Sequence, residues 1–144
     1  MARSHKELIA WQRAYELKLQ VYDLIRTGSI TRDFDLKDQL QRSASATPRL
    51  IAEGFGRYYP SHFSHYLRLA NGELKETIES LDDGVDRRHF TRDQVLPLQH
   101  LARRSSKAAT NLIAYLRTAE PPNEERPRKT RRRRQTPEPP EQDP

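Results

Sequence analysis

The stretch RSASATPRLIAEGFGR, residues 42–57, places one proline and two glycines inside a pattern that is otherwise typical of an amphipathic helix. A proline inside a helix costs about 3 kcal/mol, and each glycine costs about 1 kcal/mol relative to alanine. We expect Pro48 to kink this helix and Gly54 to let a neighbouring helix approach, such as the one that carries Trp11. We expect Gly56 to form a left-handed cap at the helix end.

Helical periodicity extends outward from this stretch in both directions. The apolar spacing predicts helices over residues 5–27 and 33–56, a third from Ser61, and a fourth from a capping box formed by Thr91 and Gln94. No segment alternates with the period of two that is typical of a strand. Four helices with short connections favour an all-α fold, an antiparallel up-down four-helix bundle.

The first predicted helix has an unusually wide apolar surface. Its apolar residues cover an arc of about 220°, whereas a surface helix of a monomeric bundle needs an arc only a little over ~100° wide. Either this helix is central in the bundle, or its second apolar face packs on another subunit.

Composition divides the chain into a domain, residues 1–118, and a tail, residues 119–144. The tail holds seven of the ten prolines and no aromatic or branched apolar residue, so we expect it to be disordered and dispensable for folding. The whole chain has 26 Lys and Arg against 20 Asp and Glu, and the tail contains the basic run RPRKTRRRR, residues 126–134. Such a run is typical of nucleic-acid contact, or of a solvated tail with no partner.

Basic residues in both parts are therefore candidates for binding RNA or DNA. In the domain, arginines recur at both ends of the opening stretch and within it, although Arg42 has Asp38 and Glu53 as alternative partners. The candidate nucleic-acid-binding residues are Arg42, Arg49, Arg57, Arg131, Arg132, Arg133 and Arg134.

Motifs that carry catalysis or bind cofactors are not found in the sequence. It has no glycine-rich phosphate loop, no nucleophile elbow and no cysteine, and its five histidines are scattered. We expect His62 and His65 to be exposed polar residues rather than metal ligands, and Glu53 to pair with a nearby arginine. No apolar stretch approaches the ~20 residues that cross a bilayer. We therefore expect a cytoplasmic protein that is not an enzyme, with no cofactor, metal or membrane partner.

The string LKDQLQRSASATPRLIAEGFGR, residues 36–57, resembles the signature of a bacterial four-helix bundle family. That family includes proteins encoded in intervening sequences of large-subunit ribosomal RNA genes. Four departures from its pattern are Ala46 for serine, Leu50 for asparagine, Glu73 where the family often has serine, and Arg88 in a turn where glycine is common. The matching positions of the signature are Leu36, Gln39, Leu40, Arg42, Ala44, Pro48, Ile51, Ala52, Glu53, Gly54 and Arg57.

The resemblance implies an assembly and a function. Relatives of the family include the accessory protein of diversity-generating retroelements, a basic homopentamer that works with a reverse transcriptase and RNA. The resemblance therefore implies a homopentamer, which would account for the wide apolar arc of the first helix. It favours a non-catalytic accessory protein whose partners are RNA or DNA and a reverse transcriptase or another protein. The alternative is an interaction scaffold that binds a partner enzyme.

Overall fold

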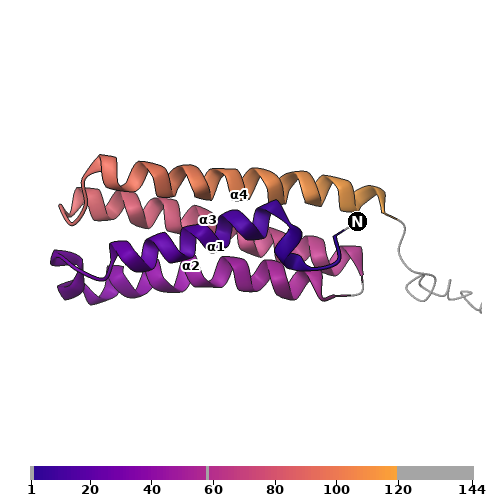
Figure 1. Cartoon of the computed structure of the whole chain (residues 1–144), viewed down its shortest axis with the longest axis horizontal. Helices are drawn as coiled ribbons and strands as arrows, with labels where there is room; N and C mark the ends of the chain where they lie inside the picture. The colour runs from indigo at the N-terminus through magenta and orange to yellow at the C-terminus, as the bar shows by residue number, and fades with distance from the viewer. Residues whose placement is uncertain (1, 58, 120–144) are drawn as a thin grey trace, which may run out of the picture.

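Four long helices form an antiparallel up-down bundle in a computed structural model that describes residues 2–57 and 59–119 (Figure 1). The long helices are α1 (Ile9–Leu24), α2 (Phe34–Phe55), α3 (Pro60–Asp86) and α4 (Arg92–Thr118). Two short 3-10 helices, η1 (His5–Glu7) and η2 (Ser29–Arg32), precede α1 and α2. Each long helix packs beside two others, with α1 and α3 each contacting α2 and α4. The predicted all-α fold is confirmed.

The helices begin where capping chemistry favours a start. The side chain of Asp33 accepts a hydrogen bond from the backbone N–H of Leu36 at the start of α2, and Pro60 occupies the first turn of α3. At α4 the predicted capping box is present, because Thr91 Oγ1 accepts from the Gln94 N–H (3.2 Å) and Gln94 Oε1 accepts from the Thr91 N–H (2.9 Å). The first predicted helix is shorter than expected, because residues 5–7 form η1 and α1 ends at Leu24.

The core consists of two apolar clusters that follow the bundle axis. One lies toward the end where α1 joins α2 and α3 joins α4, and its fully buried members include Leu17, Leu40 and Leu81. The other lies toward the opposite end and includes Ile51, Leu67 and Ala109. These positions recur every three or four residues, so the apolar stripes of α2, α3 and α4 predicted from the periodicity are confirmed.

The glycines of the opening stretch behave differently from one another. Gly54 is buried, and a Cβ atom placed on it would lie 2.6 Å from Tyr66 Cβ, so the expected close approach exists. The neighbour is α3, however, and not the helix that carries Trp11. The left-handed cap expected at Gly56 is wrong, because its φ is −72° and its N–H still bonds to the Ala52 carbonyl in helical geometry.

A buried polar contact joins α2 to α3 one turn before Pro48. Thr77 Oγ1 lies 2.8 Å from Ser43 Oγ, and the Thr47 hydroxyl donates to the Ser43 carbonyl at 3.1 Å. All three side chains are buried. Hydroxyl groups therefore make polar bonds in this region although Ala46 and Leu50 cannot.

A chain of hydrogen bonds ties the two connections at one end of the bundle together. Ser29 Oγ lies 2.7 Å from His89 Nδ1, and His89 Nε2 lies 2.8 Å from Asp33 Oδ2, which also accepts from Arg87 at 3.0 Å. The left-handed backbone of Arg88 (φ 65°) turns the chain so that the His89 N–H bonds to the Gly84 carbonyl at 2.8 Å. Glycine, which the family resemblance implies in this turn, adopts a left-handed backbone without the strain that arginine has there.

A serine hydrogen-bonded to a histidine that is hydrogen-bonded to an aspartate is also the arrangement that activates the nucleophile of serine hydrolases. Here the Asp33 carboxylate has two further roles, since it caps α2 and forms a salt bridge with Arg87. We interpret these hydrogen bonds as structural, because they join η2 and the start of α2 to the α3–α4 connection. We call the four residues Ser29, Asp33, Arg87 and His89 the tie.

The tie predicts how stability responds to acid. The hydrogen bond from His89, followed by that from Arg87, holds the pKa of Asp33 below its ordinary value. Because this pKa is lower in the folded state, the ionised Asp33 carboxylate adds to the free energy of unfolding at pH values above its unfolded pKa of about 4. This added stability is lost as the pH falls further. In urea titrations between pH 6 and pH 2.5, Asp33→Asn should therefore show a smaller acid loss of stability than the wild type.

The matched control is Asp35→Asn, an exposed carboxyl in the same turn that forms no salt bridge with any described residue. Its acid profile should follow that of the wild type. Identical profiles for Asp33→Asn and the wild type would show that the tie does not contribute to acid sensitivity.

Candidate nucleic-acid interface

The outward surface of α4 is basic over most of its length. Its apolar stripe buries Val95, Ala102 and Ala109 in the bundle, which leaves the intervening turns for polar residues. Arg103, Arg104, Lys107 and Arg117 are exposed, and Asp93 in the first turn is the one acidic residue of the helix. The positive charge of α4 is therefore not balanced within the helix itself.

Cations of α3 face those of α4 across a shallow groove. Lys75 from α3 lies opposite Arg103 and Lys107 from α4, and Asn71 and Thr110 bridge the groove at 3.3 Å. Toward the end of α4, Arg68 and Arg117 line a second hollow between the same helices. We call these five residues, Arg68, Lys75, Arg103, Lys107 and Arg117, the α3–α4 basic strip.

The cations of the strip are free of close acidic partners. None of the five forms a salt bridge within residues 2–57 and 59–119. Arg103 acts on an acid only at longer range: Arg92 and then Gln99 lower the pKa of Asp82, and Arg103 adds a weaker attraction. Exposed cations without close partners keep their full attraction for an anion.

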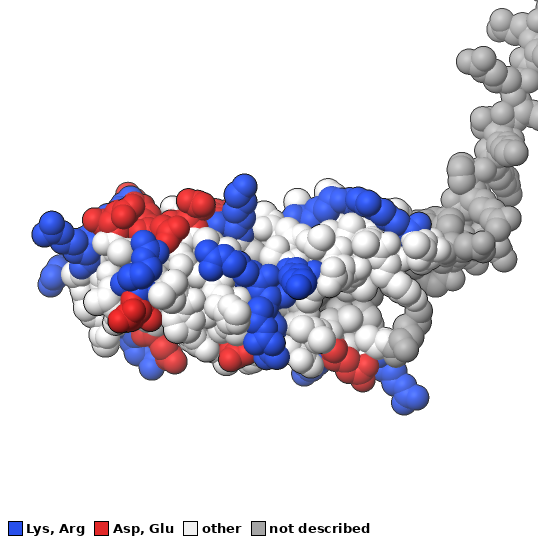
Figure 2. Space-filling model, turned by 90° about the horizontal axis from the view of Figure 1, so that it is seen from above, with Lys and Arg blue, Asp and Glu red and all other residues white. Residues whose placement is uncertain are grey.

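Charge is unevenly distributed along the bundle. Residues 23–38 and 79–95, which form the end that holds the tie, contain nine acidic and six basic residues. Figure 2 shows acidic side chains gathered toward this end, at the left, and basic side chains across the middle of the face and toward the end of α4. The strip therefore lies in the positive part of the molecule.

The arginines predicted on α2 are more strongly engaged within the protein. Arg42 forms a salt bridge with Asp38 at 3.0 Å, one of the two partners considered from the sequence. Arg57 donates to Glu53 at 3.1 Å and to the Tyr66 hydroxyl at 2.7 Å, so the expected pairing of Glu53 with an arginine is confirmed. Arg49 is exposed and forms no salt bridge with a described residue.

Arg42 and Arg49 lie close to acidic residues of α3. Burial raises the pKa of Glu73, the nearby Glu76 raises it further, and Arg42 and Arg49 oppose the shift. Arg42 and Arg49 therefore share one surface with Glu73 of α3, whereas Arg57 lies beyond the end of α2. The acidic neighbours reduce the positive potential of this surface relative to the strip.

Further expectations concern the tail arginines, two histidines, metal binding and the membrane. The basic tail residues Arg131, Arg132, Arg133 and Arg134 lie outside the described residues. His62 and His65 are exposed on the first turns of α3, as expected. Among the described residues, no three histidine, aspartate or glutamate side chains are grouped so that they could hold a metal ion, and no helix has the length and apolar character needed to cross a membrane.

Fold and surface together define a class, a basic, antiparallel four-helix bundle with cations arrayed along one groove. The chain belongs to the 23S rRNA-intervening sequence protein family, whose model matches residues 6–111. A comparison with curated proteins found no match. The family match covers all of α1, α2 and α3 and most of α4, including every strip residue except Arg117.

Proposed function

We propose that the protein is a non-catalytic, cytoplasmic accessory protein that binds RNA or DNA through the phosphate backbone. The observation that carries this proposal is the α3–α4 basic strip, five cations from two adjacent helices that form no salt bridge with described residues. Lysine and arginine contacts to phosphates give affinity with little sequence preference. Membership of a family described by its link to 23S rRNA genes supports a nucleic-acid partner.

The strip predicts a strong loss of affinity on charge reversal. Arg103→Glu combined with Lys107→Glu should weaken binding of a labelled 20-nucleotide single-stranded RNA about 100-fold and flatten the dependence of affinity on salt. Each lost phosphate contact should lower the slope of log K against log salt by about 0.7 for a single strand. Fluorescence anisotropy between 50 and 300 mM salt measures both quantities.

The matched variant combines Arg49→Glu in α2 with Arg57→Glu just beyond its end, which makes the same change in net charge on another surface. We expect it to weaken binding less, because Arg57 already interacts with Glu53 and Tyr66 and because Arg49 lies near Glu73. Far-UV circular dichroism controls for folding of both variants. Wild-type affinity and salt slope in the Arg103 and Lys107 variant would refute the strip as the binding surface.

A specific observation also favours the alternative function, a scaffold for a partner enzyme such as a reverse transcriptase. Near the ends of α2 and α4, Phe55, Phe63, Leu112 and Tyr115 line an apolar hollow, and Tyr115 is 60% exposed. An exposed apolar hollow is typical of a protein contact. Co-purification of one protein partner without nucleic acid would favour this scaffold.

We also propose that the protein is a homo-oligomer, for which the family resemblance implies five subunits. Trp11, Tyr15, Leu19 and Tyr22 form an outward stripe on α1, since Tyr15 and Leu19 are 38% and 45% exposed and Trp11 stacks on Tyr15 at 4.9 Å. The core-facing residues of α1, Ala14, Leu17 and Val21, lie on a different face. A second apolar face on one helix is typical of a subunit contact.

A further inference from the structure

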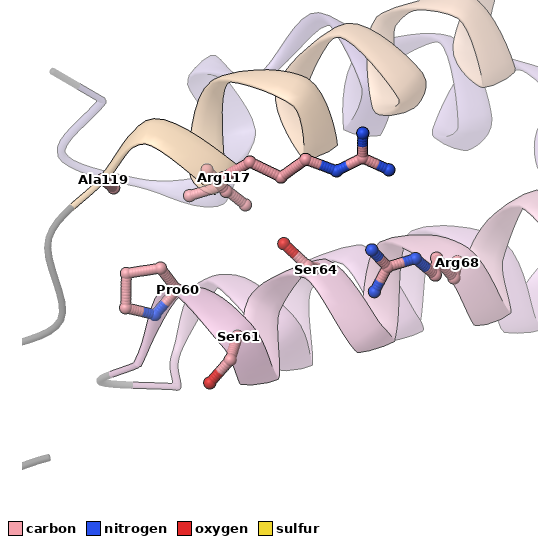
Figure 3. A pocket seen from close by; sticks show the side chains of 7 residues that line it. Pro60, Ser61, Ser64, Arg68, Arg117 and Ala119 are labelled. Carbon is pink, nitrogen blue, oxygen red and sulfur yellow. The ribbon is translucent and has the colours of Figure 1, made fainter. Parts of the chain in front are cut away.

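A hollow of about 530 Å³ lies between the first turns of α3 and the last turn of α4. Ser61, Ser64 and Arg68 line it from α3, and Arg117 lines it from α4. Figure 3 shows the Ser64 hydroxyl pointing from α3 into the gap between the two helices, with the guanidinium groups of Arg68 and Arg117 beside it. Among residues 2–57 and 59–119, no acidic residue lines the hollow.

Two buried hydroxyl residues of the helices, Ser64 and Ser80, make no side-chain hydrogen bond with a described residue, and of these two Ser64 lines the hollow. Ser64 is 6% exposed. Thr47 and Thr77, by contrast, donate to the carbonyl four residues earlier in their own helices, and the Ser105 hydroxyl donates to the Ala10 carbonyl at 2.7 Å. The Ser64 hydroxyl is aimed into the hollow and has no partner among the described residues, so it is available to a ligand there.

The two arginines add charge from two separate helices. Neither Arg68 nor Arg117 forms a salt bridge or a hydrogen bond with a described residue. The positive end of the α3 dipole favours an anion here, but the negative end of the α4 dipole lies beside it and offsets this attraction. The guanidinium groups therefore supply most of the attraction, and their planar donors match the oxygens of a phosphate group.

We propose that this hollow is a phosphate-binding site in which Arg68 and Arg117 hold a phosphate group and the Ser64 hydroxyl donates to one of its oxygens. A free phosphate, the 5′-phosphate of an RNA end and a backbone phosphodiester share this chemistry. If the phosphate belongs to RNA, the site is part of the proposed nucleic-acid-binding surface, and this part of the proposal rests on the proposed function. Binding of inorganic phosphate does not depend on that function.

The first experiment titrates the full-length protein with inorganic phosphate in a calorimeter, at an ionic strength held constant with chloride. Arg68→Gln combined with Arg117→Gln should weaken phosphate binding at least about tenfold, since both charge-assisted contacts are lost. The matched control, Arg32→Gln combined with Lys37→Gln, removes the same charge at the far end of the bundle and should leave the affinity within about twofold of the wild type. Equal affinities for the two double variants would overturn the site.

Ser64→Ala separates a ligand contact from a structural one. The substitution should weaken phosphate binding severalfold and leave the melting temperature unchanged or raised, because the hydroxyl makes no hydrogen bond with a described residue that alanine would remove. A lowered melting temperature with unchanged phosphate affinity would show that the hydroxyl is structural and would overturn its assignment.

The second experiment distinguishes the sources of the phosphate with two 12-nucleotide RNAs of one sequence, one with a 5′-phosphate and one with a 5′-hydroxyl. Loss of affinity for both RNAs in the Arg68 and Arg117 variant supports a backbone contact, and loss for the phosphorylated RNA alone supports an end contact. If the wild type binds neither RNA but binds inorganic phosphate through this pair, the site stands and the proposed function fails. The opposite result is that the Arg103 and Lys107 variant loses RNA affinity while the Arg68, Arg117 and Ser64 variants keep the wild-type affinity for phosphate. That result would overturn the phosphate site and leave the proposed function standing.

Discussion

Gly54→Ala should lower the free energy of unfolding by about 2 kcal/mol, although alanine is the better helix former. The added Cβ would lie 2.6 Å from Tyr66 Cβ and 3.0 Å from a ring carbon of Phe63. Tyr66 Cβ is attached directly to the backbone of α3, so it cannot move unless the whole helix moves. The gain in helix propensity, about 1 kcal/mol, is therefore outweighed by the separation of α2 from α3.

The control for this prediction is Gly72→Ala in the middle of α3. A Cβ on Gly72 meets no atom within 4 Å, so only the gain in propensity remains and stability should rise by roughly 0.5–1 kcal/mol. Urea denaturation of both variants measures the two changes. Stabilisation at both positions would mean that α2 and α3 are not closely packed at Gly54.

Tyr15→Glu combined with Leu19→Glu should dissociate the proposed oligomer into folded monomers. Both side chains are exposed on the outward stripe of α1, so the isolated bundle accepts the carboxylates, but a subunit contact would bury them without partners. The effective cost is several kcal/mol for each buried charge, which exceeds what most subunit contacts can offset. Light scattering measures the mass of the wild type and of the variant.

The matched control, Gln20→Glu combined with Gln41→Glu, adds the same charge outside the stripe and should retain the wild-type mass. A monomeric wild type at micromolar concentration would refute the oligomer itself. An oligomeric Tyr15 and Leu19 variant would place the subunit contact on a different surface.

Local signals in the sequence predicted most of the fold. The capping box at Thr91 and the apolar period of each helix act within a few residues, and both are present in the structure. The third helix begins at Pro60, one residue before the predicted start at Ser61. The neighbour of Gly54 and the conformation of Gly56 were predicted incorrectly, because they depend on how α2 meets α3. The tie through His89 gave no local signal, since Ser29 and Asp33 lie 60 and 56 residues before it.

The candidate site was less accessible to sequence reasoning than the fold. Spacing of four residues indicated that Arg42 could pair with Asp38, and it does. Lys75 and Arg103 are 28 positions apart, however, and only the register of α3 against α4 brings them to one groove. The scarcity of acidic residues in α4, where Asp93 stands alone, was the available signal for that surface.

The uneven charge along the bundle makes the molecule an electric dipole whose axis follows the helices. A polyanion would exert a torque on this dipole and turn the acidic end away before contact, which favours productive encounters. The 27 residues of α3 span roughly 40 Å, whereas the Debye length falls from about 30 Å at 0.01 M salt to about 8 Å at 0.15 M. At low ionic strength the field of the polyanion therefore acts on charges along most of the bundle and orients the whole molecule. At physiological ionic strength it acts only on the helical turns nearest the polyanion.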